Sequence, residues 1–156
     1  MGVGEVQQRD IAVGRRVIEF GRSLGGARSG TQRCACRSGK GFRPAVDQRA
    51  SPSYNPDVAA ATVECCEREL YGTWHLAGAD VLDRMAYALL ICRAFDLDAS
   101  TLTPATTAQL GQKAARPLNG GLRIGKAQAQ LRTPLRGVEA GLRAMRAALE
   151  AVPDGA

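Results

Sequence analysis

Aromatic side chains are scarce in this chain of 156 residues, where Phe, Trp and Tyr together make up 4%. Hydrophobic residues still account for 45%, so the core is expected to be aliphatic and rich in alanine. No apolar run approaches the roughly 18 residues that a membrane span needs, and the longest covers only residues 85–92. The amino-terminal residues also lack the apolar stretch of a secretory signal. We therefore expect a cytoplasmic protein, of a length that suits one domain, with no membrane partner.

Metal ligands are few as well. His75 is the single histidine, and the five cysteines, at positions 34, 36, 65, 66 and 92, lack the Cys-x-x-Cys spacing of zinc sites. We expect no metal site and, because the cysteine count is odd, no disulfide framework. Cys65 and Cys66 stand among glutamates that disfavour the thiolate, and are expected to fill the core. His75 has no adjacent partner for acid–base catalysis and is expected to pack or bond locally.

Glycine loops that hold phosphates are missing too. Residues 38–41 read SGKG, but Cys34 stands where a Walker A loop needs its first glycine, and Gly41 stands where that loop needs Ser or Thr. No glycine pair opens a helix after a strand with an acidic residue at the distance of a dinucleotide fingerprint. We therefore expect no nucleotide to bind through a glycine-rich loop of this chain.

Positive charge is confined to the first third of the chain. The net charge is +6; residues 1–50 carry ten basic and four acidic residues, and residues 51–156 carry eleven of each. Residues 21–39 are rich in Gly, Arg and Ser and show neither helical nor strand periodicity, so residues 1–38 are predicted to be irregular and disordered. The basic stretch formed by Arg28, Arg33, Arg37, Lys40 and Arg43 has Phe42 as its only aromatic residue. This disfavours nucleic-acid binding, because stacked bases need an aromatic platform.

Periodic patterns begin near residue 42. They predict strands at 42–46 and 73–77, a short extended piece at 102–103, a loop at 111–121, and helices at 58–70, 84–95, 125–130 and 138–151. Asp57 is the expected N-cap of the first helix, and Asp83 or Asp80 that of the second. The last helix is amphipathic, with Val138, Leu142, Met145 and Leu149 on its core face. This order of elements predicts an α/β (α+β) fragment.

A more specific pattern lies between residues 42 and 119. Residues 47–59 read DQRASPSYNPDVA, residues 72–78 read GTWHLAG, residues 93–98 read RAFDLD and residues 116–119 read RPLN. In order and spacing these segments resemble motifs of the dTDP-4-dehydrorhamnose reductase (RmlD-like) family, within the extended short-chain dehydrogenase/reductase superfamily. The resemblance covers residues 39–150 and leaves 151–156 as a tail.

The resemblance implies the C-terminal, substrate-binding lobe of such a reductase, without the complete Rossmann sheet. Reductases of this family are expected to hold NADPH or NADH in an N-terminal Rossmann domain, to use a Tyr-x-x-x-Lys pair, and to form Mg²⁺-linked dimers. In this chain Val58, His75 and Ile91, rather than lysine, stand four residues after the three tyrosines. We therefore expect no catalytic residues, no cofactor for this chain alone, and a truncated, inactive form from a truncated or frame-disrupted gene.

The same resemblance suggests four substrate contacts. Gln48, Ser51 and Tyr54 can donate hydrogen bonds to a sugar or pyrophosphate, and Arg116 can pair with phosphate. The residues equally allow a structural interpretation, in which Asp47 and Ser51 only tie the loop.

The expected function is the nucleotide-sugar-binding portion of a reductase of dTDP-rhamnose biosynthesis. The alternative is a non-catalytic partner subunit or interaction protein of the same fold. The expected partners are a dTDP-linked sugar and either a second copy of the chain or a separate reductase that contains a Rossmann domain.

Overall fold

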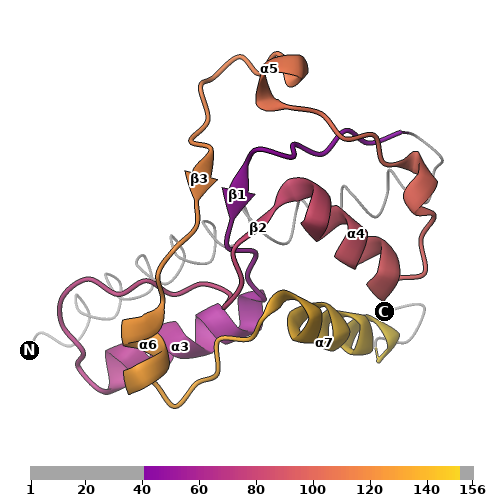
Figure 1. The fold of residues 1–156 in the computed structure, drawn as a ribbon. Coiled ribbons are helices and arrows are strands. Elements are labelled where there is room, and N and C mark those ends of the chain that lie inside the picture. The colour runs from indigo at the N-terminus through magenta and orange to yellow at the C-terminus, as the bar shows by residue number, and fades with distance from the viewer. Residues whose placement is uncertain (1–40, 152–156) are drawn as a thin grey trace, which may run out of the picture.

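The computed structural model of the protein describes residues 41–151, so the predictions made for residues 1–38 and 152–156 lie outside the described part. Helices α3 and α6 lie together on one side, α4 and α7 lie together on the other, and the strands run between the two pairs (Figure 1). In chain order the elements are β1 (Arg49–Ala50), α3 (Asn55–Glu67), β2 (Leu82–Asp83), α4 (Arg84–Ala94), a 3₁₀ helix (Ala99–Thr101), α5 (Thr107–Leu110), β3 (Asn119–Gly120), α6 (Gly125–Gln130) and α7 (Val138–Glu150).

The described sheet is small, with three strands in the order β2-β1-β3. β1 pairs antiparallel with β2 and parallel with β3, with Arg49 opposite both Asp83 and Asn119. The strand predicted at 42–46 is reduced to two isolated parallel bridges, in which Phe42 faces Leu102 and Ala45 faces Ala105. The fold is thus a small α/β arrangement, as predicted, in which single bridges take the place of a long ladder.

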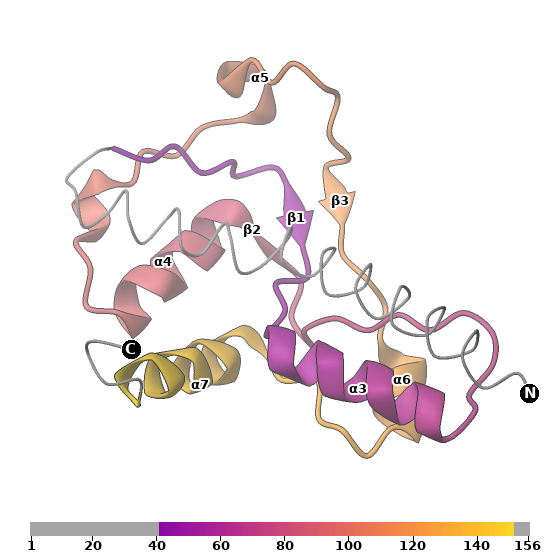
Figure 2. The same ribbon diagram turned by 180° about the vertical axis from the view of Figure 1, so that it is seen from behind.

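The strand predicted at 73–77 does not form, and that prediction is wrong. The segment runs back along α3 (Figures 1 and 2), but no strand among residues 41–151 pairs with it. An alternating pattern shows that one face of a segment is half-buried, but it does not supply the second backbone that a ladder needs. Gly78 closes the segment: its N–H donates to Ser53 Oγ at 2.9 Å, and a Cβ at this position would overlap the carbonyl of Pro52.

Helix α3 begins three residues earlier than predicted. Pro56 occupies its first turn, where the missing N–H costs nothing. Asp57 therefore lies inside the helix, and the prediction that it is the N-cap is wrong; Tyr54 holds that position without a side-chain bond. The Asp57 carboxylate instead contacts Arg136, through the backbone N–H and through Nε, each at 3.2 Å. The helix ends before Glu69, which has a left-handed φ of 49°.

Two aspartates begin two different helices. Asp83 is the N-cap of α4, where its Oδ1 accepts from the Ala86 N–H at 2.8 Å. Asp80, the other candidate for this cap, serves α7 instead and accepts from the Val138 N–H at 2.7 Å. The helices predicted at 84–95, 125–130 and 138–151 are confirmed to within one residue. The prediction that Leu149 faces the core is wrong, because its side chain is 46% exposed.

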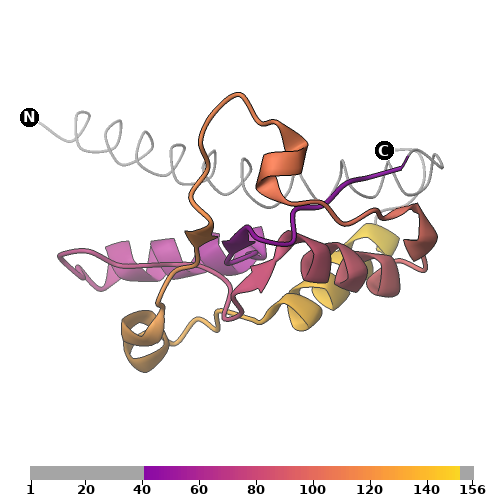
Figure 3. The ribbon, with the colours of Figure 1, turned by 45° about the horizontal axis from the view of Figure 1, so that its top comes forward.

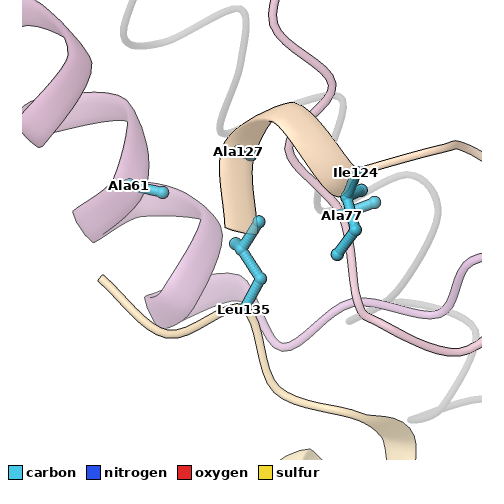
Figure 4. Close-up of a cluster of buried hydrophobic side chains, with 5 residues drawn as sticks. All are labelled: Ala61, Ala77, Ile124, Ala127 and Leu135. Carbon is cyan, nitrogen blue, oxygen red and sulfur yellow. The ribbon is translucent and has the colours of Figure 1, made fainter. Parts of the chain in front are cut away.

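The hydrophobic core consists of three small clusters, and alanine accounts for six of the 13 buried hydrophobic residues in the described part of the chain, as the composition predicted. One cluster lies between α3, α6 and the segment 73–77 (Figure 4) and contains Ala61, Ala77, Ile124, Ala127 and Leu135. A second lies between α4 and the bridged segments near Phe42 and Leu102, and a third joins α4 to α7. Within residues 41–151 we find no helix with the length and apolar character that crossing a bilayer requires.

Glu64 connects α3 to the loop that follows α6. Its carboxylate accepts from the N–H of Arg132 at 2.8 Å, from the N–H of Thr133 at 2.8 Å, and from Arg68 Nη1 at 2.7 Å. The bond from Arg132 and those from Thr133 and Arg68 favour the charged form and lower the pKa of Glu64 from 4.5 to about 2. The ionised form of Glu64 therefore holds this loop to α3 more strongly than the protonated form would.

Glu64→Gln should lower the melting temperature at neutral pH, because an amide replaces the charged acceptor of three donors. Since the folded pKa is depressed, the contribution of Glu64 is complete above pH 4.5 and is lost as the pH falls towards 2. The melting temperatures of wild type and Glu64→Gln should therefore converge over that range, as measured by circular dichroism. Glu139→Gln is the control, since Glu139 is 64% exposed and lies 4.0 Å from Arg93. A constant difference between wild type and variant across the range would contradict the prediction.

Candidate functional site

Residues 47–51 contact the chain between residues 107 and 122 one after another. Asp47 binds Thr107, Gln48 binds Thr107 and Gln112, and the Arg49 N–H donates to the Leu118 carbonyl at 2.7 Å. Ser51 ends the series, because its Oγ accepts from the Leu122 N–H at 3.0 Å. The two motifs that suggested substrate contacts, DQRAS and RPLN, are thereby brought to one edge of the molecule, next to β1 and β3.

Asp47 lies at the start of the short helix α5. Its Oδ1 and Oδ2 each accept from the Thr107 N–H at 3.0 Å, and Oδ1 also accepts from the Thr107 hydroxyl at 2.7 Å. The side-chain and backbone bonds from Thr107 lower the pKa of Asp47 below its ordinary value of 3.8. Asp47 therefore ties the loop, as the structural interpretation of the sequence proposed.

Gln48 and Ser51 both use their polar atoms on the protein. Gln48 is 3% exposed, and its Nε2 donates to Thr107 Oγ1 at 2.9 Å and to Gln112 Oε1 at 3.2 Å. Ser51 is half-buried, with the Leu122 N–H on its hydroxyl oxygen. Arg116, by contrast, is exposed, in the segment between α5 and β3 that arches away from the helices (Figures 1 and 3).

Tyr54 faces a different part of the molecule. It lines a largely apolar pocket of about 220 Å³ between the start of α3, α4 and α7, together with residues that include Pro52, Pro56, Tyr87, Leu142 and Met145. The Arg136 guanidinium lies 5.4 Å from the centroid of the Tyr54 ring. Burial raises the pKa of Tyr87, whose ring forms another wall of this pocket. The structure therefore groups Gln48 and Ser51 with the RPLN segment and places Tyr54 in a separate pocket.

Other polar candidates match the sequence analysis in part. His75 is exposed, and its Nδ1 lies 3.3 Å from the carbonyl of Arg123, 48 residues further along the chain. Burial, and then the nearby charges of Cys66 and Glu64, raise the pKa of the Cys65 thiol. Cys66 is exposed, so the prediction that it fills the core is wrong. Between residues 41 and 151, His, Cys, Asp and Glu form no group of three that could hold a metal ion.

The nicotinamide cofactor implied by the resemblance does not fit the described residues. Only β2 leads directly into a helix there, and the helix begins with Asp83, not with glycines. The Asp83 carboxylate already accepts from the Ala86 N–H at the start of α4 and would repel a pyrophosphate.

The sequence analysis missed α5 and with it Thr107 and Gln112. Thr106 and Gln109 form a capping box around the first turn of this helix, and Gly111 ends it with a φ of 53°. The spacing Thr-x-x-Gln followed by glycine is a recognised signal for a short helix. Reading that signal would have located α5, although not its contact with Asp47.

Comparison with known proteins identifies the family. The family model described as the RmlD substrate binding domain matches residues 21–151, a match that begins before residue 39, where the motifs suggested the region starts. No curated protein matches this chain significantly.

Solved structures of dTDP-4-dehydrorhamnose reductases share the fold. The reductase from Clostridium acetobutylicum has a TM-score of 0.71 and 21% identity, over 78% of this chain and 43% of its own. The reductase from Bacillus anthracis, solved in complex with NADP, has a TM-score of 0.69 and 21% identity, over 79% of this chain and 43% of its own. A hypothetical reductase from Sulfolobus tokodaii has a TM-score of 0.62 and 24% identity, over 69% of this chain and 38% of its own. This chain thus spans less than half the length of these reductases, and it belongs to the RmlD substrate-binding domain family.

Proposed function

We propose that this chain binds a nucleotide-linked sugar of the dTDP-sugar class at the edge formed by residues 47–51 and the RPLN segment. The observation that carries the proposal is that hydrogen bonds bring residues 47–51 next to the RPLN segment. Arg116, the first residue of that segment, remains exposed at this edge. A guanidinium can form two parallel hydrogen bonds with phosphate oxygens, so Arg116 is suited to a diphosphate. The family description and the names of the similar reductases support this class of ligand.

The proposal modifies the roles of the four residues suggested by the sequence. Arg116 contacts the diphosphate directly. Ser51 can still donate its hydroxyl proton to a ligand, because the bond from Leu122 uses only a lone pair of its oxygen. Gln48 is too buried to reach a ligand, and Tyr54 lies in the separate pocket.

Arg116→Gln should weaken the binding of dTDP-glucose about 10-fold, because one charge-assisted contact with phosphate is lost. Isothermal titration calorimetry of the purified chain measures the dissociation constant directly. Arg143→Gln on α7 is the matched control, since it removes the same charge from another exposed position and should leave the constant unchanged. An absence of binding by the wild-type chain at millimolar ligand would defeat the proposed function.

We further propose that the chain, as given, does not reduce its ligand. None of its tyrosines is followed by lysine four residues later, and the described residues offer no glycine-rich cofactor turn. Without a bound nicotinamide there is no hydride to transfer. Among the described residues, Cys65 and Cys66 form no disulfide, which supports the proposed reducing, cytoplasmic location.

Purified chain mixed with NADPH or NADH and dTDP-4-dehydrorhamnose should therefore consume no nicotinamide, as followed by its absorbance. Steady consumption proportional to protein concentration would contradict this prediction, provided that Arg116→Gln slows it. The second condition distinguishes the chain's own activity from that of a contaminating reductase.

The segment 73–77 favours a second role, as a partner subunit. Trp74 and Leu76 pack against the first core cluster, yet none of the N–H groups of residues 73–77 donates to a backbone carbonyl within the described part of the chain. A row of such groups is a template for a strand from another polypeptide. We propose that an α/β domain of a separate protein supplies this strand.

Amide hydrogen exchange of the isolated chain should be fast at residues 73–77, near the rate of an unfolded peptide, and orders of magnitude slower in the middle of α7. Mass spectrometry of peptides from the two regions makes the comparison within one sample. Strong protection of residues 73–77 in a monomer would rule out the free edge, and protection only in a dimer would identify a second copy as the partner.

A further inference from the structure

The loop that carries Arg116 is held at both ends by two consecutive residues. At its start, Gln112 Oε1 accepts from Gln48 Nε2 at 3.2 Å. At its end, the Leu118 carbonyl accepts from the Arg49 N–H at 2.7 Å. The residues between these anchors, 113–117, are all exposed and form part of the arch between α5 and β3 (Figure 3). The position of the loop therefore depends on its two anchors rather than on packing.

Thr107 determines the orientation of the first anchor. Its hydroxyl has a single proton, which it donates to Asp47 Oδ1 at 2.7 Å. A carboxylate only accepts hydrogen bonds, so the remaining lone pairs of the hydroxyl oxygen are left for Gln48 Nε2, at 2.9 Å. This order directs the amide group of Gln48, and not its carbonyl, towards Thr107 and Gln112.

We propose that Gln48 and Thr107 are positioning residues for Arg116, which act on ligand binding through the loop and not by contact. The inference rests on the proposed function for its effect on binding, but its structural part, the anchoring of residues 112–118, is independent of any ligand. Gln48 is 3% exposed and both of its amide hydrogens are used inside the protein. A buried amide whose two N–H groups are both bonded gives rigidity to the element that it joins.

The anchoring is tested by the NMR backbone order parameters of the amide-bearing residues of 113–118 in three variants, because the amides of this loop donate no bonds whose exchange could report it. Thr107→Val removes the hydroxyl with little change in shape, Thr107→Ser keeps it, and Gln112→Ala removes only the anchor at the start of the loop. The control is Thr62→Val, which deletes a hydroxyl that bonds the Val58 carbonyl within α3. The order parameters should fall to below about 0.6 in Thr107→Val and Gln112→Ala and remain at the wild-type values in Thr107→Ser and in the control.

Binding of dTDP-glucose then tests the effect on Arg116. Thr107→Val and Gln112→Ala should each raise the dissociation constant about 5-fold, and Thr107→Ser should restore it. In an Arg116→Gln background the same substitutions should raise the dissociation constant by less than about 2-fold, because the guanidinium that the anchor positions is gone. A merely structural role would give the same loss in both backgrounds.

Two results would overturn the inference. Unchanged order parameters at residues 113–118 in both Thr107→Val and Gln112→Ala would show that the loop is not held in this way, whether or not dTDP-glucose binds. Equal losses of affinity with and without Arg116 would show that Gln48 and Thr107 act independently of it. Failure of the wild-type chain to bind dTDP-glucose would refute the proposed function and, with it, the positioning of Arg116 for that ligand, but the order parameters of the loop would still decide the anchoring.

Discussion

The contacts between residues 47–51 and residues 107–122 hold together the part of the molecule that carries the family's motifs. They combine one short parallel strand pair with side-chain bonds from Asp47, Gln48 and Ser51. Because the strands are only two residues long, the side chains supply the connections that a longer ladder would have provided. The register of β1 against β3 thereby sets which loop residues are exposed beside it.

The rest of the described structure supports this edge through small clusters and carboxylates. The buried hydrophobic side chains form three separate clusters, each of only three to five buried residues. Three acidic side chains bind backbone N–H groups of distant segments: Asp57 that of Arg136, Glu64 those of Arg132 and Thr133, and Asp80 that of Val138. Charge-assisted bonds of this kind are stronger than neutral ones, so a modest core is compensated by directed polar contacts. The segment 73–77 makes no backbone–backbone hydrogen bond with other residues of the described part, 41–151.

Prediction from sequence succeeded where a local signal was sufficient. Asp83 followed by an apolar helical pattern located α4, and the spacing of Val138 and Leu142 located α7. It failed where the partner lies far along the chain. Asp57 has the features of an N-cap but binds Arg136, 79 residues away, and the alternation at 73–77 indicated a strand that finds no second strand in the described chain. The motif resemblance identified the family, because motifs preserve the order of residues along the chain, but it did not reveal the contacts that these residues make.

The sequence by itself determined the family, the helices with strong local periodicity, the alanine-rich core and the absence of a Tyr-x-x-x-Lys pair, because each of these depends on neighbouring residues or on composition. The tertiary structure alone decided that Gln48 is buried, that Asp80 caps α7 and that Tyr54 lies in a pocket apart from Arg116. Side chains such as those of glutamine and aspartate can bond either to a ligand or to the protein. Which of these they do is settled by groups that are distant in sequence and adjacent only after folding.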